Sequence, residues 1–308
     1  MAKRRRKERQ DIRNLKKGYY HLSTDGWKDG LLFHTKEQYA FGMIIIGLLT
    51  LWTGITVYSF TLMPNHVHIL LSGNGEACLK AFDYLRNKLS ARLVKDGYPP
   101  LPEDCWFKLK PVEDPEQMKI ELLYVDRNPY ELLLCVPSGY LWSSSYLHYS
   151  QLGTMIKGRR ADTISKRELE EMTGSRITIP PHWEFHPILG LLPTSFIDNN
   201  LFLRLFNNPK DYETRLVKDY EAFVKVSKTL GETPLFSENE VNDIVNQLLL
   251  GIFSGRQLKQ LSNDEKGRLA IILMKNYDMM AGTIATALNV SVHIVNQWFR
   301  AKDYGKQR

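Results

Sequence analysis

Two histidines separated by one residue form the most informative pattern in the sequence. His66 and His68 lie in the segment MPNHVHILL at 63–71. Side chains alternate between the two faces of a strand, so both imidazoles would share one face while Val67 enters the core. Neutral imidazole binds several divalent metals, so the pair could chelate a cation. A tetrahedral zinc site would require more His or Cys nearby. An open site completed by an oxygen donor therefore fits better, although such pairs are often only structural.

A second segment, YVDRNP at 124–129, could supply the oxygen donor. Tyr124 and Asn128 are four residues apart and would share one face of a helix, with Gln117 and Glu121 close to that face. A phenol and a carboxamide could then project together toward the histidines. The alternative is that Tyr124 is a half-buried core tyrosine with its hydroxyl at the edge.

Hydrophobic patterning predicts the elements that must position these groups. Strands are expected at 18–23, 55–62, 66–72 and 106–112, and helices at 36–52, 76–95 and 113–134. The apolar face of the helix at 76–95 comprises Cys78, Phe82, Leu85, Leu89 and Leu93. This order of elements favours an α+β fold, with a mainly antiparallel sheet and helices on one side.

Together these segments resemble the HUH single-tyrosine transposases, and most closely the REP-associated tyrosine transposases. The resemblance is carried by MPNHVHILL at 63–71, YVDRNP at 124–129 and PSGYLWSSSY at 137–146, and it covers roughly residues 18–150. It implies an HUH, ferredoxin-like catalytic domain. After Pro129 the chain departs from the family pattern, because Tyr130-Glu131-Leu132-Leu133-Leu134 replaces the usual small and basic residues.

The resemblance also implies roles for individual residues. His66 and His68 would bind Mg²⁺ or Mn²⁺, Asn128 would be the third, oxygen-donating ligand, and Tyr124 would be the nucleophile. Glu121 remains a rival ligand because the chain departs from the pattern at the end of this helix. Cleavage of single-stranded DNA would then give a 5′-phosphotyrosine and a 3′-hydroxyl that can rejoin strands.

The charge distribution indicates a polyanionic partner. Residues 1–17 carry nine Lys or Arg against two acids, and residues 256–308 carry nine against four, on a chain of net charge +7. The basic tail at 1–17 could equally be a solvated, disordered segment. On the helix at 76–95, Arg86, Lys88 and Arg92 are candidates for DNA backbone contacts. Trp106 and Trp142 are available for base stacking.

The carboxyl-terminal segment predicts a helix-turn-helix. Ser262-Asn263-Asp264-Glu265 is a capping box that opens a helix to about Asn276, and helices at 283–288 and 292–301 follow. The apolar arc of the last helix comprises Val292, Ile294, Val295, Trp298 and Phe299. The opposite arc, proposed to read a major groove, comprises His293, Asn296, Gln297 and Arg300. The trailing Lys302, Lys306 and Arg308 favour DNA, while a helical bundle for protein contacts is the alternative.

Several other classes of protein are disfavoured. Cys78, Cys105 and Cys135 are far apart, which fits a reducing, cytoplasmic setting and argues against a disulfide framework. Residues 41–63 lack charge and would be long enough for a membrane span. The residue composition changes at Gly54, however, from typical of a helix to typical of a strand, so a buried helix and strand explain the stretch better. His182 and His186 do not fit the HExxH arrangement and are interpreted as structural.

The expected organisation is a basic tail at 1–17, a catalytic domain at 18–150, a mostly helical connecting region at 151–255 and a DNA-binding region at 256–308. The expected activity is DNA transposition or strand transfer on single-stranded, hairpin-flanked DNA, in a monomer or homodimer that contacts no membrane. The alternatives are an HUH nickase without transposition and an inactive transcriptional regulator that binds hairpins.

Overall fold

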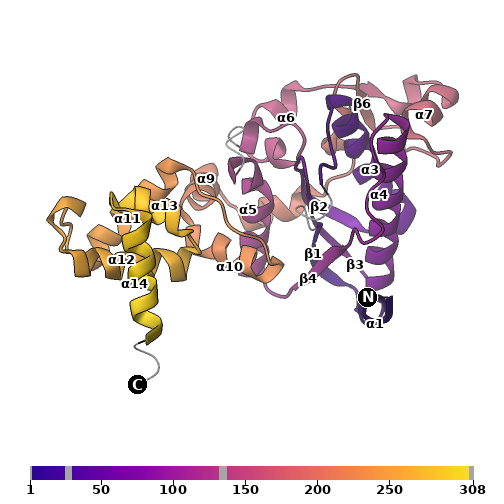
Figure 1. Ribbon diagram of the computed structural model, residues 1–308. Coiled ribbons are helices and arrows are strands. Elements are labelled where there is room, and N and C mark those ends of the chain that lie inside the picture. The colour runs from indigo at the N-terminus through magenta and orange to yellow at the C-terminus, as the bar shows by residue number, and fades with distance from the viewer. Residues whose placement is uncertain (1, 25–29, 132–136, 305–308) are drawn as a thin grey trace. The chain divides into compact units, whose positions relative to one another are not determined.

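The computed structural model describes residues 2–24, 30–131 and 137–304 and divides the chain into two compact units (Figure 1). The first comprises Met1–Pro129 with Leu134–Leu216, and the second Tyr130–Leu133 with Val217–Arg308. Cys135 and the predicted helix end at 132–134 lie outside the described residues. Each unit has its own hydrophobic core.

A four-stranded antiparallel sheet organises the first unit. Its strands are β1 (Gly18–Thr24), β2 (Thr56–Leu62), β3 (Val67–Gly73) and β4 (Phe107–Val112), in the spatial order β2-β3-β1-β4. Every neighbouring pair is antiparallel. The central β1 therefore separates β3 from β4 and can connect residues of both.

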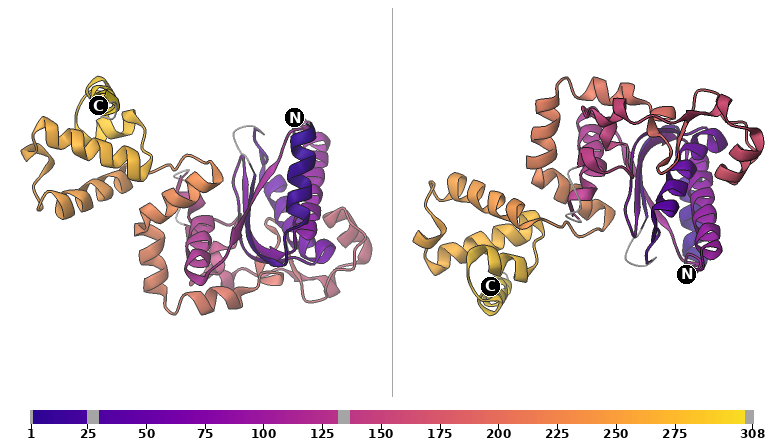
Figure 2. Two further views of the ribbon diagram at one scale, coloured as in Figure 1. Left: turned by 90° about the horizontal axis from the view of Figure 1, so that it is seen from below. Right: turned by 90° about the horizontal axis from the view of Figure 1, so that it is seen from above.

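The two faces of this sheet differ in chemistry. One face is apolar, with Leu22, Val67 and Ile69 in the core beneath helices α3 (Lys36–Thr53) and α4 (Gly75–Lys95). Alternate residues of the same strands are polar and face helix α5 (Pro115–Glu131), which lies across the sheet from α3 and α4 (Figure 2).

The predicted α+β class with a mainly antiparallel sheet is confirmed. The expectation of helices on one side holds for α3 and α4, but α5 covers the opposite face. The physical reason is that the polar face is also buried: Thr61 donates to the Val125 carbonyl of α5 at 2.7 Å, and Ser59 donates to Asp126 at 2.8 Å. Buried polar groups require such partners.

The uncharged stretch at 41–63 is a helix followed by a strand, as predicted. Helix α3 ends at Thr53, and Gly54 adopts the left-handed conformation at φ 70° that closes it. Strand β2 starts two residues later. Among the helices of the described residues, none has both the length and the apolar character needed to cross a bilayer.

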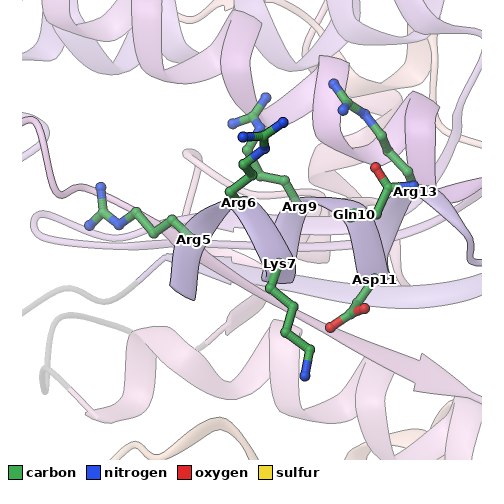
Figure 3. Close-up of a pocket in the computed structure, with 7 residues that line it drawn as sticks. All are labelled: Arg5, Arg6, Lys7, Arg9, Gln10, Asp11 and Arg13. Carbon is green, nitrogen blue, oxygen red and sulfur yellow. The ribbon is translucent and has the colours of Figure 1, made fainter. Parts of the chain in front are cut away.

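The basic segment at the amino terminus is a helix, so the alternative of a disordered tail is wrong. Helix α1 (Ala2–Arg13) packs on α4, with Arg13 Nε 3.0 Å from Glu76 and Arg9 paired with Asp83. Arg9 also lies over the Trp106 ring, 5.5 Å from its centroid. Figure 3 shows Lys7 and Asp11 on the side of α1 opposite these arginines, along a surface hollow that the helix lines. Two of the basic side chains of this helix are thus paired with acids of α4.

The connecting region contributes to the first core. Phe185 lies in β6 (Glu184–His186) and Trp183 directly precedes it. Both are buried with the residues of the main sheet. Strand β6 lies between β5 (Arg159–Arg160) and β7 (Gly190–Leu191). His186 Nδ1 accepts hydrogen bonds from the Ile188 and Leu189 backbone at 3.2 Å, a structural role. The helices of this region within the first unit are α6 (Leu152–Met155), α7 (Lys166–Thr173), α8 (Asn199–Leu205) and most of α9 (Pro209–Lys218).

The second unit is helical, and its core lies among the helices that follow α9. These are α10 (Tyr220–Leu230), α11 (Glu238–Ile252), α12 (Asn263–Tyr277), α13 (Ala281–Leu288) and α14 (Val292–Tyr304). The predicted capping box opens α12: Ser262 Oγ accepts from the Glu265 backbone, and Glu265 Oε2 accepts from the Ser262 backbone at 2.9 Å. Helices α9 and α10 are separated at Asp219.

Candidate active site

The two predicted histidines lie side by side at the start of β3. Their ring centroids are 4.8 Å apart at an interplanar angle of 87°, and Val67 between them is buried in the core. His66 Nδ1 lies 2.8 Å from Asn65 Oδ1, which orients the His66 ring. The predicted sharing of one face is therefore observed.

Helix α5 brings Tyr124 and Asn128 to these histidines. Asn128 Oδ1 lies 3.1 Å from His66 Nε2, while its Nδ2 donates to the Tyr124 carbonyl at 2.8 Å. The Tyr124 ring packs edge-on against His68, with centroids 5.5 Å apart. The structure thus gathers all four residues that the sequence singled out for chemistry.

A fifth residue, His21 of β1, completes the cluster and was missed by the sequence analysis. Its Nε2 lies 2.9 Å from His68 Nδ1, and its Nδ1 lies 2.7 Å from Glu121 Oε2. Lys110 Nζ of β4 lies 2.5 Å from the other carboxylate oxygen of Glu121. Alternation along the predicted first strand, with Leu22 facing the core, was the signal that could have placed His21 on this face.

The neighbouring candidate Gln117 lies elsewhere. Its Oε1 accepts from the Glu113 backbone at 2.9 Å, at the start of α5. Glu121 is directed at His21 and Lys110 instead of at His66.

Burial and charge set the protonation of the cluster. Complete burial of His68, beside the imidazoles of His66 and His21, holds its pKa well below its ordinary value near 6.5, although a hydrogen bond to Asn128 opposes this shift. His68 is therefore neutral at pH 7, the form that binds metals. Burial would raise the pKa of Glu121, but hydrogen bonding to His21 and the charge of Lys110 lower it overall, so Glu121 is a carboxylate.

The arrangement fits a divalent cation with mixed nitrogen and oxygen ligands. Within residues 2–24, 30–131 and 137–304, no three His, Cys, Asp or Glu side chains are grouped as metal ligands. Beside the two histidines, Asn128 offers an amide oxygen as a further donor. Adjacent ligands of an octahedral cation at 2.0–2.1 Å lie roughly 3.0 Å apart. The 3.1 Å between His66 Nε2 and Asn128 Oδ1 matches that spacing.

A separate polar network, also missed from the sequence, holds the tyrosine helix in place. Asp126 accepts from Ser59 at 2.8 Å, from Tyr212 at 2.8 Å and from His148 Nδ1 at 2.6 Å. Ser59 also contacts Ser144 of the PSGYLWSSSY segment at 3.0 Å. This buried network joins α5 to β2, to 143–148 and to α9.

The three basic residues predicted to contact DNA from α4 make contacts within the chain. Arg86 donates to the Pro102 carbonyl at 3.1 Å, Lys88 to the Gly174 carbonyl at 2.7 Å, and Arg92 to Asp96 at 2.7 Å. Helix α4 covers the apolar face of the sheet, whereas α5, which carries Tyr124 and Asn128, lies on the opposite face (Figure 2). The structure does not bring these residues to the cluster, and their DNA contacts stay a prediction.

The two tryptophans considered for base stacking are also engaged. Trp106 packs edge-on against Phe82 with centroids 5.4 Å apart, and Trp142 stacks on Tyr39 at 5.1 Å.

The polar arc of the last helix is exposed. His293, Asn296, Gln297 and Arg300 are all solvent-accessible, and His293 lies 3.1 Å from Gln297. The predicted apolar arc needs correction, because Val295 is buried but Val292 is 45% and Ile294 37% exposed. The helix contacts α12 through a narrower stripe, in which Trp298 lies close to Gly267. The Lys302 side chain, Lys306 and Arg308 lie outside the described residues.

Comparison with known proteins gives one slight likeness. No family model matches the sequence, and no curated protein matches it. A solved structure of a REP-associated tyrosine transposase bound to a REP hairpin is similar at 12% identity and a TM-score of 0.36, over 44% of this chain and 81% of that one.

Proposed function

We propose that this protein cleaves and rejoins single-stranded, hairpin-flanked DNA, as a transposase or strand-transferase with Tyr124 as nucleophile. The observation that supports it most is the packing of Tyr124 against His68, whose ring lies beside that of His66, while Asn128 contacts both His66 and the Tyr124 carbonyl. A phenol, two imidazoles and an amide oxygen are the groups that a metal-dependent phosphotyrosine mechanism requires.

The chain's own residues would perform the reaction as follows. Tyr124 Oη attacks the scissile phosphorus and loses its proton, while the bond from phosphorus to the 3′ oxygen breaks and that oxygen leaves as a 3′-hydroxyl. The product is a phosphodiester between Tyr124 and the 5′ end, so attack by a 3′-hydroxyl reverses the step and joins strands. His66, His68 and Asn128 would hold a divalent cation, which when bound would neutralise charge on the phosphate oxygens.

Access to the tyrosine is part of the proposal. Tyr124 is 2% exposed, whereas His66 is partly exposed. A DNA phosphate would therefore approach along the His66 side, and side chains that cover the phenol would move on binding.

The test is incubation of the full chain with labelled hairpin-flanked single-stranded DNA and Mn²⁺, followed by denaturing gel electrophoresis. We expect a covalent protein–DNA complex that survives SDS. Hairpin binding without such a complex would instead support the alternative of an inactive regulator. A strand-transfer assay would separate a transposase from a nickase, because only the transposase joins the cleaved end to a new strand.

Metal-dependent cleavage should depend more on Asn128 than on the polar residues in the earlier turns of α5. Asn128→Ala should raise the Mn²⁺ concentration needed for half-maximal cleavage by about 10–100-fold, because an oxygen ligand is lost. Gln117→Ala is the matched control on the same helix and should leave the requirement unchanged. A larger effect from Glu121→Ala than from Asn128→Ala, with no effect from changing its partner His21, would make Glu121 the third ligand.

We further propose that α13 and α14 act as a helix-turn-helix on the duplex stem of the hairpin. Two short helices joined at Asn289, which adopts φ 51°, with an exposed polar arc on the second, support this proposal.

Replacing Asn296, Gln297 and Arg300 together with Ala should lower affinity for a hairpin more than for a stemless strand. Each lost base contact is worth about 1–3 kcal/mol. Both affinities should be measured at one salt concentration, since phosphate contacts are screened. Equal losses would mean that the helix contributes only charge, and no loss would assign it to protein contacts.

A further inference from the structure

A continuous chain of polar groups leads from the edge of the sheet to the buried His68. It runs from Lys110 on β4 to Glu121 on α5, then to His21 on β1 and His68 on β3, with successive separations of 2.5, 2.7 and 2.9 Å. The side chains of Glu121 and His21 are fully buried, and the residue His68 is 0% exposed. No solvent molecule is needed to connect these four residues.

The sheet register explains why the chain forms. On β1, His21 is the direct partner of Lys110 on β4 and of Leu70 on β3, and Ser23 is the partner of His68. Since β1 lies between β3 and β4, the His21 ring can reach a carboxylate held by Lys110 and also the imidazole of His68. These positions are fixed by backbone pairing, so the chain is preorganised.

The donors and acceptors determine the direction of the hydrogen bonds. A carboxylate only accepts, so His21 Nδ1–H donates to Glu121. With that proton on Nδ1, the Nε2 of His21 can accept, and His68 Nδ1–H donates to it across the 2.9 Å between these two atoms. The lone pair of His68 is left on Nε2.

We propose that Lys110, Glu121 and His21 are positioning residues that hold His68 with its proton on Nδ1, so that Nε2 is presented to the catalytic cation. This inference rests on the proposed function for the identity of the ligand atoms. Partners of this kind orient histidine ligands and raise their basicity in metal sites. In the other tautomer the proton would occupy the coordinating nitrogen and block it.

Helix α5 supplies a matched control. Glu121 and Asp126 are both buried carboxylates, and each accepts from the Nδ1 of a histidine. Only Glu121 is connected through its histidine to the His66 and His68 pair. Asp126→Asn therefore perturbs a buried carboxylate–histidine pair of the same helix without touching the chain to His68.

The test uses the full-length, metal-free protein and then Mn²⁺ alone, without DNA. Nitrogen-15 NMR of the His68 ring should show the Nδ1–H tautomer in the unmodified protein and in Asp126→Asn. Glu121→Gln and His21→Phe should lose this preference and bind Mn²⁺ about 10–100-fold more weakly. Lys110→Met, at a position with 15% side-chain exposure, is the variant to use if either buried change prevents folding, and it should weaken Mn²⁺ binding in the same direction.

Two results would overturn the inference: an Nε2–H tautomer of His68 in the unmodified protein, or a Mn²⁺ affinity of Glu121→Gln equal to that of the unmodified protein. Neither readout requires catalysis. Failure of the proposed function would give a different result. The unmodified protein would then bind Mn²⁺ normally and show the Nδ1–H tautomer of His68, but it would form no covalent complex with DNA.

Discussion

Tyr124→Phe should abolish the covalent protein–DNA complex and reduce strand cleavage by at least roughly 10³-fold, the scale of loss when a nucleophile is removed. Only the phenolic oxygen is deleted, so the ring contacts with His68 and His21 survive. Affinity for DNA should therefore change little. Gel assays of the covalent complex and equilibrium binding on the same preparations would measure both quantities.

Tyr146→Phe is the matched control for this change. Tyr146 is also buried in the first unit, within the PSGYLWSSSY segment, and burial raises the pKa of its phenol. It should form the covalent complex normally. An SDS-stable complex in Tyr124→Phe, lost instead in Tyr146→Phe, would move the nucleophile to the other tyrosine.

The second large effect concerns the histidine pair. The double change His66→Ala and His68→Ala, or chelation by EDTA, should stop cleavage, because two of the three proposed ligands or the cation itself are lost. We expect a rate loss of more than about 100-fold, with Mn²⁺ binding weakened in the same variants. Cleavage rate and Mn²⁺ affinity would be measured over a range of Mn²⁺ concentrations.

Two controls define that experiment. His34→Ala removes a histidine that stacks on Tyr98 outside the cluster and should have no effect. Circular dichroism should show that the double variant keeps its helices, because the core residues Val67 and Ile69 are unchanged. Full cleavage in EDTA would contradict the metal mechanism, and full cleavage by the double variant would place the cation elsewhere.

Local patterns were sufficient to predict most of the catalytic unit. An apolar stripe of five residues, from Cys78 to Leu93, predicts the helix at 76–95, and all five residues are buried. The spacing of His66 and His68 and the four-residue spacing of Tyr124 and Asn128 each fix one face of one element. These faces meet because the helix that carries the tyrosine packs on the strand that carries the histidines.

Features that depend on pairing between distant segments could not be predicted in this way. His21 acquires its role only because β1 lies between β3 and β4, an order that no local pattern specifies. Asp126 meets His148 and Tyr212 across the fold. The basic charge at the amino terminus indicated a polyanionic partner or a solvated tail, and no local pattern showed that Arg9 and Arg13 pair with acids of α4.

The most direct test of the central claim is to identify the residue that carries the DNA. The covalent complex would be digested with nuclease and trypsin and analysed by mass spectrometry. Cleavage after Lys119 and Arg127 gives the peptide 120–127, IELLYVDR, in which Tyr124 is the only tyrosine. We predict that this peptide carries the nucleotide remnant through a 5′ phosphate on Tyr124. A remnant on any other peptide, with 120–127 recovered unmodified, would contradict the assignment of Tyr124 as the nucleophile.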